Sequence, residues 1–158
     1  MSVAFRRESD EEHLEPKFEL PIAPGPNLVT ARGLRLLERK AAAFRQAVAD
    51  AQDEEQRKLL KRDLRYWDTR LTTAEIAPPP PEGTVSIGCR VTIRMNGAQR
   101  VLSIVGGDEA EPATGRIAFS APLARALIGA FVGEAIPFND KADAIEILAI
   151  AAIGDEPL

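Results

Sequence analysis

Two stretches of apolar residues at heptad spacing constrain this chain more than any other feature of its sequence. One lies within residues 30–51 and the other within residues 54–77, and in each the apolar residues recur at alternating steps of three and four. Their members are Leu34, Leu37, Ala41, Phe44, Val48 and Ala51, then Leu60, Leu64, Trp67, Leu71 and Ala74. Continuing the first repeat would place charged residues at the apolar positions, so the two repeats do not share a phase. The pattern predicts two helices that fold back on each other, and one bent helix that pairs with another molecule is the alternative.

Capping signals mark the ends of these helices. Thr30 is the expected N-cap of the first helix, and Asp53 with Gln56 three residues later has the pattern of a capping box for the second. A run of prolines, Pro78 to Pro81, then stops the second helix and predicts an extended linker over residues 78–84. The hairpin is therefore expected to occupy residues 28–77.

After the linker the apolar period changes from helical to about two residues. Strands are expected from Val85, with a tight turn at Asn96–Gly97, a return strand at 100–105, and further strands at 115–119, 134–138 and 144–150. A short helix is expected at 122–128, capped by Ser120 or Ala121. These elements predict an α+β domain with a mainly antiparallel sheet over residues 85–151, followed by a frayed tail at 152–158.

Residues 1–27 have no apolar period. Four prolines alternate with charged residues, which predicts a disordered, solvated tail. The chain's single histidine, His13, falls in this tail, so neither a zinc site nor a histidine base is expected.

Composition limits the function further. The net charge is −4, but residues 28–77 hold 11 basic and 8 acidic side chains, so only the predicted hairpin is net positive. This excess favours a protein partner with nucleic acid nearby over direct recognition of DNA. The single cysteine, Cys89, and the absence of a signal sequence or a long apolar run predict a cytoplasmic protein outside the membrane.

Basic residues recur along the second predicted helix. We expect a basic surface at Arg57, Lys61, Arg62 and Arg65, which guides RNA, meets an acidic partner, or is simply a solvated helix face.

The order of residues in the C-terminal half is specific. The chain reads I-V-G-G-D-E-A from Ile104, then G-R-I-A-F-S-A-P-L-A-R-A-L-I-G from Gly115, then V-G-E. This closely resembles the GreA/GreB family of bacterial transcription elongation factors, and V-T-A-R-G-L-x-x-L from Val29 is similar to the start of the family's coiled coil. The resemblance covers residues 28–150. It implies an antiparallel coiled-coil hairpin joined to an FKBP-like domain; prolyl isomerase activity is not expected, since few aromatic residues are available for its pocket.

The resemblance also implies a function. In the family, the globular domain docks at the secondary channel of bacterial RNA polymerase, and acids at the hairpin tip help hold the second magnesium ion while the polymerase hydrolyses backtracked RNA. The factor is not an enzyme, binds no metal or other cofactor in isolation, and contacts the polymerase Mg²⁺ only in the complex. We expect a monomer, with nascent RNA as a further contact inside the complex. The matching S-x-P-x-x-R segment implies that Ser120, Pro122 and Arg125 bind the polymerase, although Ala121 stands where the family more often has serine.

The predicted tip departs from the family. The family motif D-x-S-E-N-x-x-Y is absent, the first helix is several turns shorter, and A-D-A-Q-D-E-E-Q supplies Asp50, Asp53, Glu54 and Glu55 instead. These acids either assist the polymerase magnesium or simply favour the start of the second helix. A relative of the regulator of nucleoside diphosphate kinase, which binds polymerase without stimulating cleavage or competes with cleavage factors, is the first alternative. A structural protein whose hairpin associates with a second copy is the other.

Overall fold

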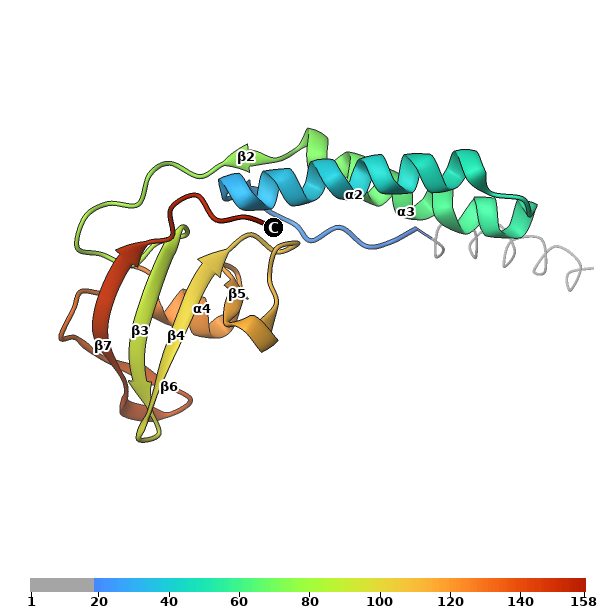
Figure 1. Ribbon diagram of the computed structural model, residues 1–158. Helices are drawn as coiled ribbons and strands as arrows, with labels where there is room; N and C mark the ends of the chain where they lie inside the picture. The colour runs from blue at the N-terminus through green and yellow to red at the C-terminus, as the bar shows by residue number, and fades with distance from the viewer. Residues whose placement is uncertain (1–18) are drawn as a thin grey trace, which may run out of the picture. The chain divides into compact units, whose positions relative to one another are not determined.

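A computed structural model describes residues 19–158, and the chain forms two compact units (Figure 1). Of the described residues, one unit contains 19–25 and Leu37–Thr73, and the other contains Pro26–Leu36 and Ala74–Leu158. The predicted tail at 1–27 and His13 fall largely or wholly outside the described residues. The predicted domain limits stay a prediction. Among the described residues, no helix is long and apolar enough to cross a membrane.

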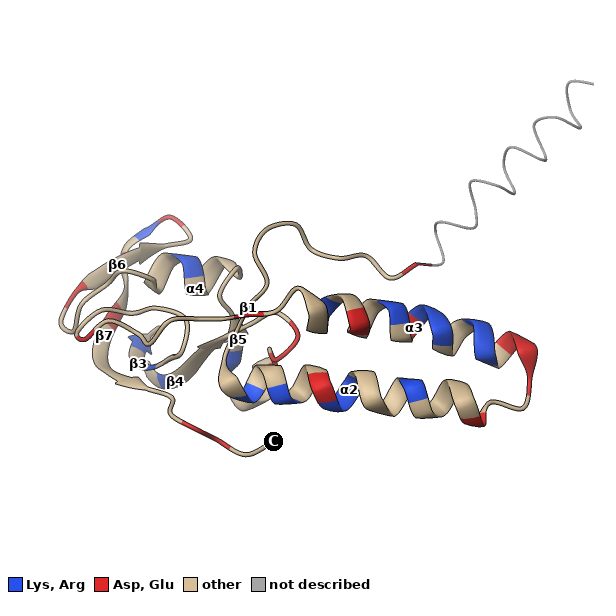
Figure 2. Cartoon of the chain, turned by 90° about the horizontal axis from the view of Figure 1, so that it is seen from above, with Lys and Arg blue, Asp and Glu red and all other residues tan. Residues whose placement is uncertain are grey.

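Helices α2 (Ala31–Asp50) and α3 (Glu54–Thr72) form the predicted hairpin and lie side by side in Figures 1 and 2. Thr30 caps α2 as expected, because its hydroxyl accepts a hydrogen bond from the Gly33 amide at 3.0 Å. The apolar seam lies inside: Leu37 and Ala41 are each only 1% exposed. Polar contacts flank the seam, with Arg45 Nη2 2.8 Å from Asp68 Oδ1 and the ammonium of Lys40 5.6 Å from the centre of the Trp67 ring.

Two details of the predicted second helix are corrected. Asp53 is at the N-cap position of α3, but its side chain makes no capping hydrogen bond, so the capping box is not formed. The helix ends at Thr72 rather than Ala77. The hydroxyls of Thr72 and Thr73 donate to carbonyls of the last helical turn, and the chain then becomes extended. Strand β2 (Glu75–Ile76) pairs in parallel with β1 (Leu28–Val29), and the Glu75 amide donates to the Asn27 carbonyl at 2.9 Å.

The C-terminal part is a five-stranded sheet in the order β5-β4-β3-β7-β6. The strands are β3 (Cys89–Met95), β4 (Ala98–Val105), β5 (Arg116–Ala118), β6 (Ala135–Phe138) and β7 (Lys141–Ala152). Only the β4–β5 pair is parallel, so the predicted α+β fold with a mainly antiparallel sheet is confirmed. The turn is at Asn96–Gly97 as predicted, and the φ angles of 54° and 75° explain why asparagine and glycine occur there.

The core of this unit lies between the sheet and helix α4 (Pro122–Leu127). Alternate residues of β3, Val91 and Ile93, are fully buried, as are Ala124 and Leu127 of α4. Several strand limits differ from the predicted ones. The sheet begins at Cys89 rather than Val85, and β4 and β7 extend beyond their predicted ends. Cross-strand backbone pairing lengthens these strands into residues whose side chains carry no clear alternation.

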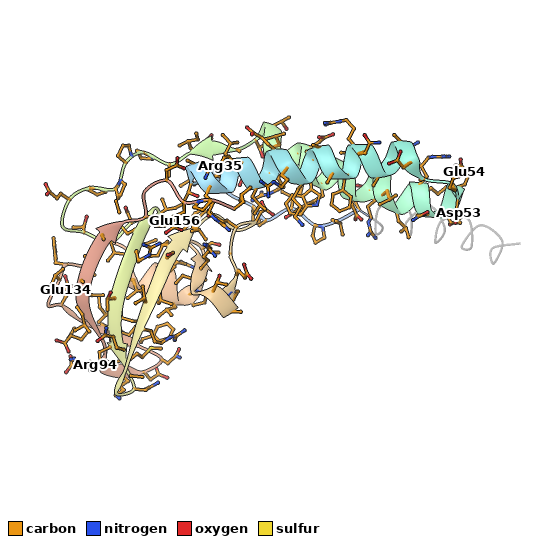
Figure 3. The ribbon with its side chains drawn as sticks, viewed as in Figure 1. Arg35, Asp53, Glu54, Arg94, Glu134 and Glu156 are labelled. Carbon is orange, nitrogen blue, oxygen red and sulfur yellow. The ribbon has the colours of Figure 1, made fainter. Side chains whose placement is uncertain are left out.

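The last residues are hydrogen-bonded, which corrects the predicted frayed tail at 152–158. The amide of Ile153 donates to the Gly88 carbonyl at 2.8 Å. Arg35 Nη1 is 2.9 Å from Asp155, and Arg90 pairs with Glu156. Figure 3 labels Arg35 and Glu156. Arginines far away in the sequence therefore hold this acidic segment, a relationship that local pattern does not reveal.

Candidate functional site

Four carboxylates are concentrated where the hairpin turns (Figures 2 and 3). Asp50 is the last residue of α2, Asp53 is the N-cap of α3, and Glu54 and Glu55 are in the first turn of α3. All four residues are exposed. Acidic side chains are stabilising at a helix N-terminus, because the helix dipole is positive there. The same acids also present anionic oxygen atoms at the end of the hairpin.

Three of these four carboxylates have a hydrogen bond or an ion pair with a neighbouring side chain. Gln46 Nε2 donates to both carboxylate oxygens of Asp50 at 3.1 Å. Glu54 pairs with Arg57, and Glu55 Oε1 is 4.0 Å from the Lys58 ammonium. Exposed ion pairs of this kind contribute only about 0–1 kcal/mol to stability. A metal cation can therefore replace the basic side chain beside the carboxylate at small cost in free energy. Among residues 19–158, no group of three or more His, Cys, Asp or Glu side chains is arranged to hold a metal ion.

The basic surface lies on one face of α3. Lys58, Lys61, Arg62 and Arg65 are spaced at i, i+3, i+4 and i+7, which places them in a row on a helix, and they line one groove together with Glu19, Glu55 and Leu59. Lys61 has no ion-pair partner among the described residues, and Arg62 pairs with its neighbour Asp63 at 2.9 Å. We call Lys58, Lys61, Arg62 and Arg65 the cationic stripe.

Arg57, the fourth member of the predicted basic surface, is not part of this stripe. Its guanidinium donates to the Ala51 carbonyl at 2.6 Å and pairs with Glu54, so it stabilises the turn of the hairpin. The structure thus brings Lys61, Arg62 and Arg65 together and adds Lys58. Whether this surface faces RNA stays a prediction.

Glu19 binds the stripe from outside the hairpin. The guanidinium of Arg65 donates to Glu19 Oε2 at 3.0 Å. This hydrogen bond lowers the pKa of Glu19 and raises the pKa of Arg65. Sequence reasoning missed this contact, because no periodic pattern connects residue 19 with α3.

The predicted polymerase-binding residues are grouped at the start of α4. Pro122 begins the helix, Ala121 is its N-cap, and Ser120 lies in the preceding turn. Arg125 is exposed, whereas Ala124 and Leu127 on the other face are buried. Three large apolar residues after the helix are also exposed: Ile128 at 41%, and Phe131 and Val132 at 56% each. Sequence reasoning did not single out these three, although two of them, Phe131 and Val132, are bulky apolar residues between Gly129 and Gly133, which is unusual in a turn.

Glu109, the acid of the I-V-G-G-D-E-A segment that precedes Ala110, is buried. It is 5% exposed, accepts a hydrogen bond from Thr30 Oγ1 at 2.5 Å, and lies 3.2 Å from Arg32 Nη1. The carboxylate therefore holds the first turn of α2 against the loop after β4. The sequence gives one signal for this, since Gly33 leaves room where a side chain on α2 would meet Glu109.

The chain contains a helical hairpin with an acidic turn and a unit with a five-stranded sheet, and its sequence is similar to that of a known class of transcription proteins. The model of the family described as "Transcription elongation factor, GreA/GreB, C-term" matches residues 80–152. Transcription elongation factor GreA of Vibrio cholerae is 33% identical over 125 residues, which cover 78% of this chain and 73% of that protein. This chain belongs to the GreA/GreB family of transcription elongation factors.

Other relatives match over shorter segments. Transcription elongation factor GreA of Thermomicrobium roseum is 35% identical over 79 residues, which cover 48% of this chain. The chain spans about half the length of that relative, 51%. Among solved structures, GreA factor homolog 1 (Gfh1) of Thermus thermophilus aligns with 81% of this chain and 100% of its own, at 17% identity and a TM-score of 0.38.

Proposed function

We propose that this protein is a transcription elongation factor that binds bacterial RNA polymerase, acts through its secondary channel, and promotes cleavage of backtracked transcripts by the polymerase. Membership of the GreA/GreB family supports the partner. The observation that carries the proposed activity is the group of four exposed carboxylates, Asp50, Asp53, Glu54 and Glu55, at the turn of the hairpin. We propose that it acts as a cytoplasmic monomer.

The donor set at the tip suits magnesium. Carboxylate oxygens are the ligands that Mg²⁺ prefers, and Mg²⁺ usually takes only one or two of them from a protein. A second magnesium ion in the polymerase would supply activation of a water molecule against the phosphodiester. The tip acids would add ligands to an ion that the polymerase already holds in part. The chain itself is then not an enzyme, and the chemistry belongs to the polymerase.

Asp53 is the best placed of the four acids. Its side chain makes no capping hydrogen bond, whereas Glu54 and Glu55 have basic partners on their own helix. A carboxylate that has no ion pair with any of residues 19–158 does not have to break one of these contacts before it binds a cation. Asp53 is therefore the first candidate for a magnesium ligand, with Asp50, Glu54 and Glu55 in support.

The second surface in this proposal docks on the polymerase. Arg125 is exposed in the last turn of α4, three residues after Pro122, and the exposed Phe131 and Val132 add apolar area in the same unit. Arginine and aromatic residues are typical anchors of protein interfaces. In the complex, Lys61, Arg62 and Arg65 would contact the nascent RNA, whose phosphates complement their charge.

A second candidate keeps the partner but not the cleavage. In this version the protein is a relative of the regulator of nucleoside diphosphate kinase that binds polymerase without stimulating cleavage, or competes with cleavage factors. Two observations favour it. The helices have 20 and 19 residues, so each spans only about 30 Å. Moreover, Glu54 and Glu55 are paired within α3 rather than directed to solvent alone.

One experiment separates the two candidates. Polymerase stalled in a backtracked state with 3′-labelled RNA is mixed with the full-length protein, and both binding and release of short 3′ fragments are measured. Binding with faster fragment release supports cleavage assistance. Binding without release supports the regulatory alternative, and the absence of binding contradicts both.

A further inference from the structure

The cationic stripe on α3 already has one intramolecular anion. Glu19 binds Arg65 at one end of the stripe, and Lys58, Lys61 and Arg62 continue the row for two helical turns toward the tip. The exposed side chain of Leu59, at 51%, lies in the same groove. The groove therefore has room and positive charge beyond the position that Glu19 occupies.

The sequence just before Glu19 is complementary in charge. Residues 8–15 read E-S-D-E-E-H-L-E and contain five acids and no lysine or arginine. The acids are Glu8, Asp10, Glu11, Glu12 and Glu15. Glu19 is hydrogen-bonded to Arg65 of the stripe. The last acid of the segment, Glu15, is only four residues before Glu19 in the sequence.

The chain is long enough to reach all members of the stripe. Lys58 and Arg65 are seven residues apart, which on a helix is about 10 Å. An extended chain spans about 3.3 Å per residue, so the four residues from Glu19 to Glu15 already reach that far. Tethering also raises the effective concentration of the segment to about the millimolar range, which compensates for weak individual ion pairs.

We propose that the acidic segment at residues 8–15 binds the cationic stripe of α3 in the same molecule and shields it from other polyanions. The partner of this surface is then a part of the chain itself, and RNA must displace it. The inference does not depend on the polymerase or on transcript cleavage, because it concerns the charge of the stripe alone.

The docking is tested with a spin label on the full-length chain. Leu14→Cys carries the label, and a parallel labelling of the unsubstituted chain measures any reaction of Cys89, which is 1% exposed. At about 0.05 M salt we expect loss of amide NMR signal at Lys58, Lys61, Arg62 and Arg65, with recovery near 0.5 M salt because screening weakens exposed pairs. The loss should also disappear in K58Q/K61Q/R65Q, whose three side chains are exposed. Signal at the stripe that is unaffected by the label would overturn the proposal.

A mixed sample identifies the source of the segment. Isotope-labelled protein without the spin label is combined with spin-labelled protein without the isotope. We expect no signal loss in this mixture. Loss at the stripe would mean that the segment comes from a second copy, which overturns the intramolecular assignment.

Shielding is tested with a 5′-fluorescein single-stranded RNA of uridines. We expect E11Q/E12Q/E15Q to raise the affinity for this RNA about tenfold at low salt, since fewer anions compete for the stripe. The matched control E75Q/E82Q/D143N removes three exposed acids elsewhere and should change the affinity less than about twofold. Equal affinities of the two variants, including no binding by either, would overturn the shielding.

Discussion

The hydroxyl of Thr30 donates a hydrogen bond of 2.5 Å to the buried carboxylate of Glu109, 79 residues further along the chain. The same hydroxyl accepts the Gly33 amide, and Arg32 is 3.2 Å from the other carboxylate oxygen. One acid thus joins the N-cap of α2 to the loop after β4. Several consequences of this contact can be measured.

Replacing Glu109 should destabilise the protein. Glu109→Ala removes a buried acceptor and leaves Arg32, whose side chain is 14% exposed, without its anion. We expect the free energy of unfolding in urea to fall by about 2–4 kcal/mol. The nearby exposed acid in Glu111→Ala is the control and should change it by less than about 0.5 kcal/mol. Equal losses in both variants would contradict the role of Glu109.

Whether a substitution of Gly33 stabilises or destabilises the protein depends on the position of the Glu109 carboxylate. A Cβ at position 33 would lie 2.8 Å from Glu109 Oε1. Alanine normally stabilises a helix interior relative to glycine by about 1 kcal/mol, but Gly33→Ala should destabilise this protein. In a Glu109→Ala background the same change should become stabilising, because the clash is gone. A stabilising Gly33→Ala in the otherwise unchanged chain would show that the carboxylate is not held at this position.

The contact between Glu19 and Arg65 should depend on pH. The hydrogen bond from Arg65 lowers the pKa of Glu19 from its ordinary value of 4.5. Since the pKa is lower in the folded state, the contact contributes fully above 4.5 and is lost as the pH falls through the lowered value. An NMR titration of the Glu19 carboxyl should show its pKa rising toward the ordinary value in R65Q. A pKa that R65Q leaves unchanged would argue against the contact.

The exposed side of α4 should be needed for polymerase binding. Arg125→Glu reverses an exposed charge that has no ion-pair partner among the described residues, and we expect it to weaken binding about tenfold. Arg100→Glu, also exposed but on β4, is the matched control. Unfolding of each variant is followed in urea, so a loss of binding can be separated from a loss of fold. Equal effects of the two variants would place the docking surface elsewhere.

Local pattern predicted the parts of this structure that depend on local chemistry. The heptad seams gave the two helices, Thr30 gave the first cap, and Asn96–Gly97 gave the hairpin turn. The end of α3 was missed, because pairing of β2 with β1 across the chain outweighs the helical pattern of Ala74. The burial of Glu109 depends on Thr30 and Arg32, far away in sequence, so its own neighbours reveal nothing of it.

For the tip, sequence predicted the position of the four acids but not their partners. The ion pair of Glu54 with Arg57 and the missing cap bond of Asp53 depend on side-chain conformation at the turn. These details decide which carboxylate is available to a metal ion. The family motif could not supply them, since this tip departs from it.

The most direct test of the account is the release of 3′ RNA fragments from a backtracked polymerase by tip variants. The unsubstituted protein should accelerate release, and D50N/D53N/E54Q/E55Q should lose this acceleration while still binding the polymerase. A control with four exposed acids changed elsewhere, E38Q/E75Q/E82Q/D143N, should keep it. Acceleration that survives the tip substitutions, or a protein that binds without any acceleration, would contradict the proposed role of the tip acids.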